Sequence, residues 1–361
     1  MMLDQLLRRG NNNADLLRLI AAAAVIWGHS YALVPEPGVE EPLRGILGFD
    51  YSGSLAVKFF FFLSGILVTN SWLTKPSAIR FASARIFRIF PLLIVSAIAT
   101  IVIMGPALTS MPASEYFHHR GELMQVLTHP YIDYRLPGLF DHALFPQANG
   151  SIWTIKYELM LYATLMGAGM CGLFRFRRSA TAVLLTVILV SLIWPEYITT
   201  IGLPNVNKGG QLPAFFAFGS LLALYKSHVR IDARMCIGLG ILALAVRHGP
   251  AFEFAFLPAF FIGALWVMSL DAVKSIRLPG DFSYGVYVFG WPLQNTFANL
   301  FPGSGIHGNQ VMTFACALFL AIISWFLVEK PCIALGHKVP DLLMRKRQDV
   351  KVEDRKATYM Q

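Results

Sequence analysis

Among the ionisable side chains inside stretches of apolar residues, where a charge is costly, two are candidates for chemistry. They are His29 in NNNADLLRLIAAAAVIWGHSYAL and Glu158 in NGSIWTIKYELMLYA. An ionisable group within a membrane span costs roughly 2.5–3.5 kcal/mol on insertion scales, so each of them calls for a partner or a task. A neutral imidazole is cheaper to bury and can accept a proton, which makes His29 a candidate general base. Glu158 is a candidate for the carboxylate that orients and stabilises this imidazole, as in a hydrolase triad.

The positions of these residues along their helices predict similar depths in a bilayer. His29 lies about 16 Å beyond Arg18 on nearly the same helix face, with Asp15 one turn below Arg18. Glu158 would lie about 10 Å below the outer surface and His29 about 20 Å above the inner one, which match in a hydrocarbon core about 30 Å thick. The alternative is that Asp15 and Arg18 cap a helix end and His29 bonds to a neighbouring helix. Glu158 would then pair with a Lys or Tyr, without chemistry.

Two arginines, Arg85 and Arg88 in RFASARIFRIFPLL, lie one helical turn apart where an apolar run begins. Guanidinium groups bind phosphate oxygens in a bidentate manner, so this pair could clamp a phosphorylated ligand. The alternative is ordinary anchoring at the cytoplasmic surface, because loops on that side are rich in Lys and Arg.

Other polar residues in the apolar runs are candidates for substrate binding or structural support. Small residues at helix contacts explain several of them equally well without a site. The four cysteines have no metal-ligand spacing, and no metal is expected. The candidates are Ser64, Trp153, Tyr157, Tyr162, Ser283, Tyr284 and Tyr287, besides Asp15.

The elements that must position these residues are membrane helices. Hydrophobic residues make up 55% of the 361 residues and charged ones only 14%, far from a soluble domain. The apolar runs approach the length of roughly 17–25 residues that crosses a bilayer. The fold predicted is an all-α polytopic membrane protein with about ten transmembrane helices. The spans are expected at 16–34, 55–73, 86–108, 152–173, 180–195, 211–226, 236–248, 251–270, 282–300 and 309–328.

The basic residues choose the orientation of these spans. With both termini in the cytoplasm, 23 of the 30 Lys and Arg residues lie on inner faces, as the positive-inside rule requires. The net charge of +9 then reflects this bias and a basic tail, which suits an anionic inner leaflet and does not imply nucleic acid. We therefore expect a transmembrane domain over 1–335, a basic cytoplasmic tail over 336–361, and a location in the bacterial inner membrane.

Six elements occur in this order: Asp15, Arg18 and His29; Phe60 to Gly65; Arg85 and Arg88; Trp153, Thr154 and Glu158; Ser283 to Tyr287; and Glu329 with Pro331. Together they resemble the acyltransferase-3 family of integral membrane acyltransferases, and most closely its bacterial polysaccharide O-acetyltransferases. One departure is that many members carry a histidine shortly after the Ser-Tyr-x-x-Tyr element, where this chain has Gly290 before Trp291.

The resemblance implies an enzyme that moves an acyl group, expected to be acetyl, from cytoplasmic acyl-CoA to a hydroxyl of a cell-surface or lipid-linked glycan. The CoA phosphates would lie at Arg85 and Arg88, with Arg18 nearby. His29, held by Glu158, would act as general base or carry the acyl group transiently. A polysaccharide-related transporter or exporter is the alternative, because ionisable residues within spans also mark transport pathways. A structural partner of polysaccharide machinery is a third interpretation.

Overall fold

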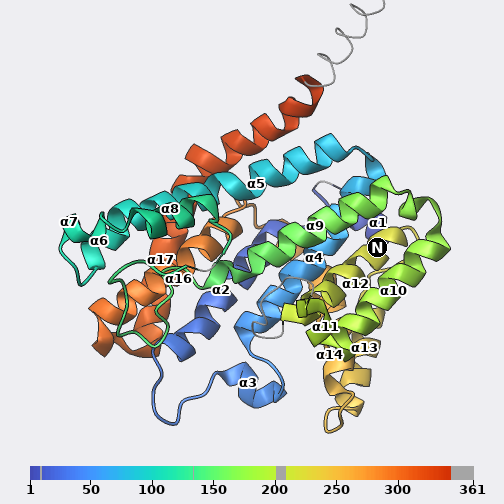
Figure 1. Cartoon of the computed structure of the whole chain (residues 1–361). Helices are drawn as coiled ribbons and strands as arrows, with labels where there is room; N and C mark the ends of the chain where they lie inside the picture. The colour runs from blue at the N-terminus through green and yellow to red at the C-terminus, as the bar shows by residue number, and fades with distance from the viewer. Residues whose placement is uncertain (9, 133, 201–208, 343–361) are drawn as a thin grey trace, which may run out of the picture.

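The structure of the protein, a computed structural model, describes residues 1–8, 10–132, 134–200 and 209–342. Across these residues it is helical and has no strand, only the isolated bridges Met2–Arg230 and Tyr134–Asn149 (Figure 1). The elements are α1 (Leu3–Leu6), α2 (Ala14–Leu33), α3 (Pro42–Leu47), α4 (Ser52–Thr74), α5 (Ala78–Ala99), η1 (Thr100–Met104), α6 (Gly105–Leu108), α7 (Ala113–Tyr116), α8 (Arg120–Thr128), η2 (Ser151–Thr154), α9 (Ile155–Met170), η3 (Leu173–Arg175), α10 (Arg177–Ile193), α11 (Pro195–Thr200), η4 (Gly209–Gln211), α12 (Leu212–Leu224), α13 (Ala233–Ala245), α14 (Phe252–Val267), α15 (Asp271–Lys274), α16 (Ser283–Leu300), η5 (Pro302–Ser304), α17 (Gly305–Ser324) and η6 (Trp325–Glu329).

Each of the ten predicted spans coincides with a helix or a run of helices. The third begins earlier than predicted, at Ala78 and not at 86, because Ser77 caps it by accepting a hydrogen bond from the Arg80 backbone N–H. Its helix therefore starts before the apolar run does, and Arg85 and Arg88 lie on regular helix. The last helix continues through residue 335 to Leu342, and the predicted tail lies outside the described residues from 343 onward.

Four of the described helical segments are long and apolar enough to cross a membrane: Ala14–Leu33, Ser52–Thr74, Ala78–Leu108 and Pro302–Leu342. Three shorter apolar segments, Gly209–Leu224, Ala233–Ala245 and Phe252–Val267, lie in the sequence between the third and the fourth of these. The all-helical class is confirmed, and so are helices of membrane-spanning length. About ten crossings stays a prediction, because the remaining described helices are too short or not apolar enough to qualify by length and composition.

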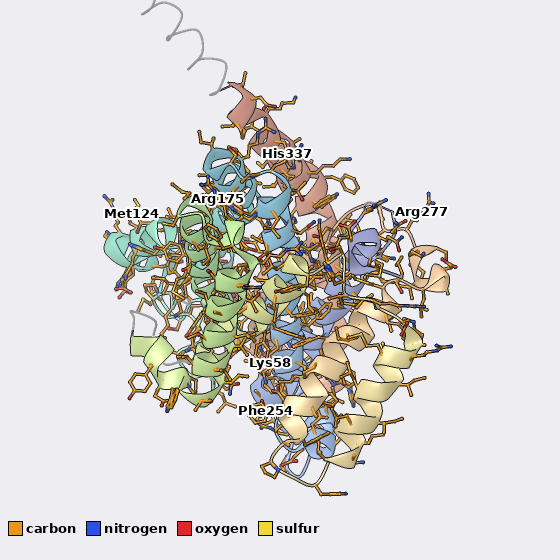
Figure 2. All side chains as sticks on the ribbon, turned by 90° about the vertical axis from the view of Figure 1, so that its right-hand side faces the viewer. Lys58, Met124, Arg175, Phe254, Arg277 and His337 are labelled. Atoms are coloured by element: carbon orange, nitrogen blue, oxygen red, sulfur yellow. The ribbon has the colours of Figure 1, made fainter. Side chains whose placement is uncertain are left out.

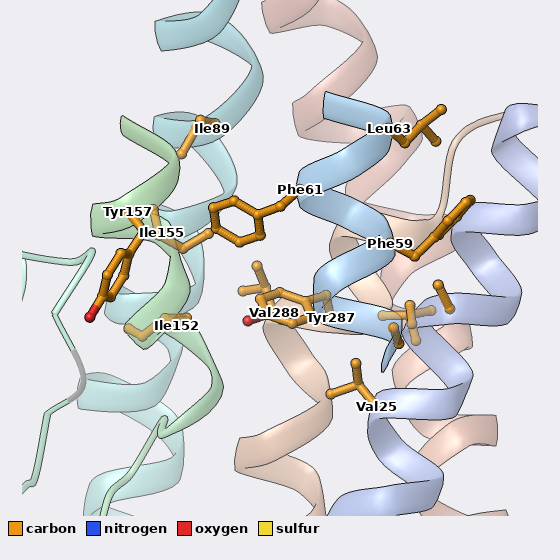
Figure 3. Packing of buried hydrophobic residues seen from close by; sticks show 14 of the residues in the cluster. Val25, Phe59, Phe61, Leu63, Ile89, Ile152, Ile155, Tyr157, Tyr287 and Val288 are labelled. Carbon is orange, nitrogen blue, oxygen red and sulfur yellow. The ribbon is translucent and has the colours of Figure 1, made fainter. Parts of the chain in front are cut away.

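Helix α4 is the centre of the bundle. In its most apolar 18-residue stretch 78% is buried, against 22% in that of the last helical segment, Pro302–Leu342. It packs against α12 and α2, while α16 packs against α17 and α2. Phe61 of α4 points toward Ile155 at the start of α9, and Tyr287 of α16 lies below it with its hydroxyl toward α9 (Figure 3). The parts of α4, α9 and α16 that carry candidate residues therefore face one another in the core.

Helices α4 and α12 approach each other closely because each offers a glycine. A Cβ on Gly65 would lie 2.1 Å from the Phe216 carbonyl oxygen, and a Cβ on Gly219 would lie 2.1 Å from that of Phe62. Gly285 of α16 meets Ala321 of α17 in the same way, at 2.7 Å. Gly65 and Gly285 therefore serve close helix packing, as small residues commonly do where membrane helices meet.

Replacing Gly65 with alanine should therefore destabilise the bundle by about 1–3 kcal/mol, because backbone atoms of Phe216 must move away. The measurement is thermal unfolding of the purified protein in detergent. Gly167→Ala is the matched control, since a Cβ there meets nothing within 4 Å and alanine favours helix by up to about 1 kcal/mol. Equal melting temperatures for the two variants would refute the close α4–α12 contact.

Candidate active site

The predicted site residues divide between two cavities. One, of about 240 Å³, is lined by basic and hydroxyl-bearing side chains and is called here the arginine cavity. The other, of about 610 Å³, contains His29 and is called the histidine cavity. Val57 and Tyr287 line both, so they lie where the two cavities meet. The arginine cavity takes Arg18, Ser64, Arg85, Arg88, Glu158, Tyr162, Ser283 and Tyr284 from the predicted set, and the histidine cavity takes His29 and Trp153.

Arg88 is the most heavily paired cation of the arginine cavity. Its Nη2 lies 2.6 Å from Asp281 Oδ2, and its Nη1 lies 2.8 Å from Glu329 Oε2. The guanidinium also lies over the rings of Tyr284 and Trp325. Two buried carboxylates neutralise this arginine, so its main effect is to tie α5 to the start of α16 and to η6.

Asp281 connects Arg88 to Arg18, whose Nη1 lies 3.3 Å from the same Oδ2 atom. Its other oxygen accepts hydrogen bonds from the Ser283 backbone N–H and from Ser283 Oγ at the beginning of α16. Burial opposes ionisation, but Arg88 and Arg18 together lower the pKa of Asp281 below its usual value. Arg18, Arg88 and Ser283 are therefore brought together, with Asp281 as their common partner.

Arg85 differs from Arg88 because it forms no ion pair among the described residues. Its guanidinium lies over the Tyr162 ring, 5.7 Å from the centroid, and its Nε is buried without a hydrogen-bond partner. A buried guanidinium nitrogen with no acceptor is costly and is ready to bind an anion. Of the two arginines predicted to hold phosphates, Arg85 is the one left available.

Glu158 faces the arginine cavity and belongs to a short hydrogen-bond chain. Tyr162 donates to Glu158 Oε1, one turn along α9, and Ser64 Oγ lies 2.7 Å from the Tyr162 hydroxyl. Because the Tyr162 proton goes to Glu158, Ser64 donates to Tyr162. The chain fixes the wall of the cavity between α4 and α9, beside Arg85.

His29 lines the histidine cavity and contacts Trp291 of α16. The two rings meet edge to face, with centroids 5.0 Å apart and planes at 82°. Trp291 is itself fixed, because its Nε1 donates to the Gln147 carbonyl oxygen over 3.0 Å. The His29 ring nitrogens have no hydrogen-bond partner among the described residues, so they are available to a ligand of the cavity.

The predicted pairing of Glu158 with His29 is not seen. Glu158 takes its hydrogen bond from Tyr162, and the two residues line different cavities. Tyr287 lies between them and is held in place by Thr154, 2.6 Å from its hydroxyl, and by the Ser151 carbonyl oxygen that accepts from it. The expected depths matched, but depth along a helix does not determine which side chain occupies the space between two others.

The remaining candidates have supporting positions. Trp153 packs edge to face on Tyr157, with centroids 5.7 Å apart, and Tyr157 is fully buried in the core. Tyr284 donates to the Ile89 carbonyl oxygen over 2.9 Å, which joins α16 to α5. Asp15 is exposed at the start of α2 and forms no ion pair within the described part of the chain. It does not join the Asp281 cluster directly.

Sequence reasoning missed Asp281 and Trp291 as site residues. Asp281 lies two positions before the Ser-Tyr-Gly-x-Tyr element. Its only sign in the sequence was that it is a carboxylate just outside a span, on the side where several arginines are expected. Trp291 lies next to the departure at Gly290 and gave no signal of its own. Lys58 of α4 pairs with Asp50 at 2.6 Å and with Glu253 at 3.4 Å, and Lys58 and Asp50 line the histidine cavity.

Residues 11–330 match the Acyltransferase domain that defines the acyltransferase-3 family. The chain belongs to this family. An O-acetyl transferase of Shigella phage Sf6 is 27% identical over 338 residues, which cover 89% of this chain and 95% of that protein. Nodulation protein 10 of Rhizobium leguminosarum bv. viciae is 26% identical over 362 residues, which cover 90% of this chain and 94% of that protein. No solved structure matches the chain significantly.

Family membership confirms that the protein is an acyltransferase, and the resemblance to an O-acetyl transferase supports transfer to oxygen. The apolar helices place it in a membrane. The transporter alternative therefore gives way to the enzyme.

Proposed function

We propose that this acyltransferase moves an acetyl group from cytoplasmic acetyl-CoA to a hydroxyl of a cell-surface or lipid-linked glycan. The observation that carries the proposal is the pair of adjoining cavities, one with an unpaired guanidinium and the other with an unpaired imidazole. A transferase with a polar donor on one side of a membrane and an acceptor on the other needs two such chambers that meet.

On the donor side, the CoA phosphates would bind at Arg85, while Arg18 and Arg88 nearby are engaged by Asp281 and Glu329. His337 of the last helix also lines this cavity, and it lies with Arg175 and Arg277 in the upper half of Figure 2, away from Lys58. The pantetheine arm would then extend toward Val57 and Tyr287, which border both cavities. The thioester would reach the histidine cavity at this point.

On the acceptor side, His29 would take the proton of the glycan hydroxyl as its oxygen attacks the thioester carbonyl carbon. The new C–O bond forms, the C–S bond breaks, and the CoA thiolate leaves and recovers the proton. Transfer through an acetyl-imidazole on His29 would reach the same products in two steps. In both routes Trp291 limits how the ring can turn.

The proposed topology has about ten crossings with both termini in the cytoplasm. The short apolar helices α12, α13 and α14 would cross beside the four long ones. This places the arginine cavity toward the cytoplasm, where acetyl-CoA is made, and the loop that carries α3 outside. In Figure 1, α3 lies at the bottom, far from the end of the last helix at the top.

The test is the ester content of the surface glycan in the wild type and in a strain that lacks the protein. We expect the deletion strain to export the polymer without its acetyl ester, and the ester to return when the gene is restored. Membrane vesicles that contain the protein should transfer label from acetyl-CoA to the glycan. Export that stops with the ester would favour the transporter instead. Glycan acetylated normally without the protein would refute the proposal.

Arg85→Ala should raise the KM for acetyl-CoA roughly 10- to 100-fold, because one charged hydrogen-bond donor to phosphate is lost. The kcat should change far less, since Arg85 touches no reacting atom in the proposal. Initial rates in membrane vesicles at increasing acetyl-CoA separate the two constants. Arg80→Ala is the control, since Arg80 is exposed and pairs with Asp341 away from the cavity. An unchanged KM in Arg85→Ala would place the phosphates elsewhere.

A further inference from the structure

The histidine cavity has the size and the walls of a site for one sugar ring. Its volume of about 610 Å³ falls within the range of roughly 300–1,000 Å³ that is typical of small-molecule sites. Trp153, Trp291 and Tyr51 line it and offer broad apolar faces at low conformational cost. Such faces pack against the C–H groups of a pyranose ring. The transfer chemistry alone does not require these aromatic walls in the histidine cavity.

Glu41 is one of two buried acids of this cavity, with Asp50, and is only half satisfied. It is 5% exposed, and its Oε2 accepts a hydrogen bond from the Arg44 backbone N–H over 2.8 Å, which caps α3. Its Oε1 is buried and has no hydrogen-bond partner. A buried carboxylate oxygen without a donor is costly, so a ligand that brings a donor to it would be stabilised.

Gln147 repeats this arrangement on another side of the cavity. Its backbone carbonyl accepts from Trp291 Nε1 and from Asn295 Nδ2, which fixes the residue against α16. Its side-chain Oε1 is buried without a partner, as in Glu41. These two buried side-chain oxygens are both acceptors that lack a donor.

The cations of the same cavity are already engaged or exposed. Lys58 is 2% exposed and pairs with Asp50 and Glu253. Arg44 is exposed and lies over the Tyr51 ring, 5.9 Å from its centroid. Among the described residues that line the cavity, three carboxylates, Glu40, Glu41 and Asp50, accompany two cations, Lys58 and Arg44. An anionic ligand would meet carboxylates without gaining a free buried cation.

We infer that the histidine cavity binds a neutral sugar residue whose hydroxyls donate to Glu41 and Gln147, and that it discriminates against acidic sugars. The inference rests on the proposed function, since it names the acceptor class for the same site. Hydroxyl donors satisfy both orphan oxygens. A uronate carboxylate would instead be repelled by Glu41, which costs affinity.

The test is binding of simple glycosides to the purified full-length protein in detergent, read by saturation-transfer NMR. The probes are methyl α-D-glucopyranoside and methyl α-D-galactopyranoside, with methyl α-D-glucuronide as the acidic counterpart. The neutral glycosides should bind at least about tenfold more tightly than the glucuronide. Glu41→Gln should weaken the neutral glycosides roughly tenfold and bring the glucuronide close to them, because the charged acceptor is lost.

Glu41→Gln keeps an oxygen to cap α3, so the fold should survive, and Gln147→Leu supplies a second variant with weaker neutral binding. Glu122→Gln, which removes a charge from exposed α8, should bind all probes as the wild type does. Equal affinity for the glucuronide, unchanged affinities in Glu41→Gln, or no binding of any neutral glycoside would each overturn the inference. Because binding is read without transfer, an inactive protein that still prefers neutral glycosides would refute the proposed function and leave this inference standing.

Discussion

Replacing His29 with alanine is expected to lower acetyl transfer by roughly 10²- to 10⁴-fold, while the protein still folds and still binds acetyl-CoA. His29 is the one imidazole among the described residues that line the histidine cavity, and its ring nitrogens have no other hydrogen-bond partner there. Removing it leaves the acceptor hydroxyl without a base and without an alternative acyl carrier. Donor binding should persist, because Arg85 lies in the other cavity.

The measurement is acetyl ester on the host polysaccharide together with initial rates in vesicles, at matched protein levels. His29→Gln should be equally inactive, since an amide fills similar space and cannot take the proton at neutral pH. His142→Ala is the control, because His142 is exposed and lies outside both cavities. Normal transfer by His29→Ala at normal expression would end the catalytic assignment of this residue.

Most of the fold could be predicted from the sequence, because lipid-exposed and core helices alike leave long apolar runs. All ten predicted segments are helical, and errors concern their ends. The start at Ala78 was missed because the helix is capped by Ser77 within a polar stretch, where hydropathy gives no signal. The close contact of Gly65 with Phe216 follows from the small-residue pattern, but its partner helix does not.

The candidate site could be predicted as a set of residues but not as pairs. Which side chains meet depends on the rotation and tilt of each helix, and spacing along the chain does not fix either. Glu158 therefore faces Tyr162 and the arginine cavity, although its predicted depth matched that of His29. Arg85 and Arg88 look equivalent in sequence, yet Asp281 and Glu329 neutralise Arg88 alone. These partners come from distant segments that no local pattern connects.

That difference between the arginines predicts a large loss of stability when Arg88 is replaced by glutamine. Its partners Asp281 and Glu329 have side chains that are 10% and 1% exposed, so two buried carboxylates would lose their main cation. Removing one partner of a buried ion pair costs about 3–5 kcal/mol, and the lower value applies because Arg88 is itself 22% exposed. The expected result is a melting temperature several degrees lower in detergent and little protein in the membrane.

A double variant tests whether the stability lost in Arg88→Gln is electrostatic. Adding Glu329→Gln to Arg88→Gln should restore part of the lost stability, because it removes the carboxylate that is left buried, while Arg18 still holds Asp281. Arg80→Gln, which breaks the exposed pair with Asp341, should cost less than about 1 kcal/mol. If the two substitutions at 88 and 329 were simply additive, the cluster would owe its stability to packing around Arg88, and the electrostatic account of how α5, α16 and the last helix are held together would fail.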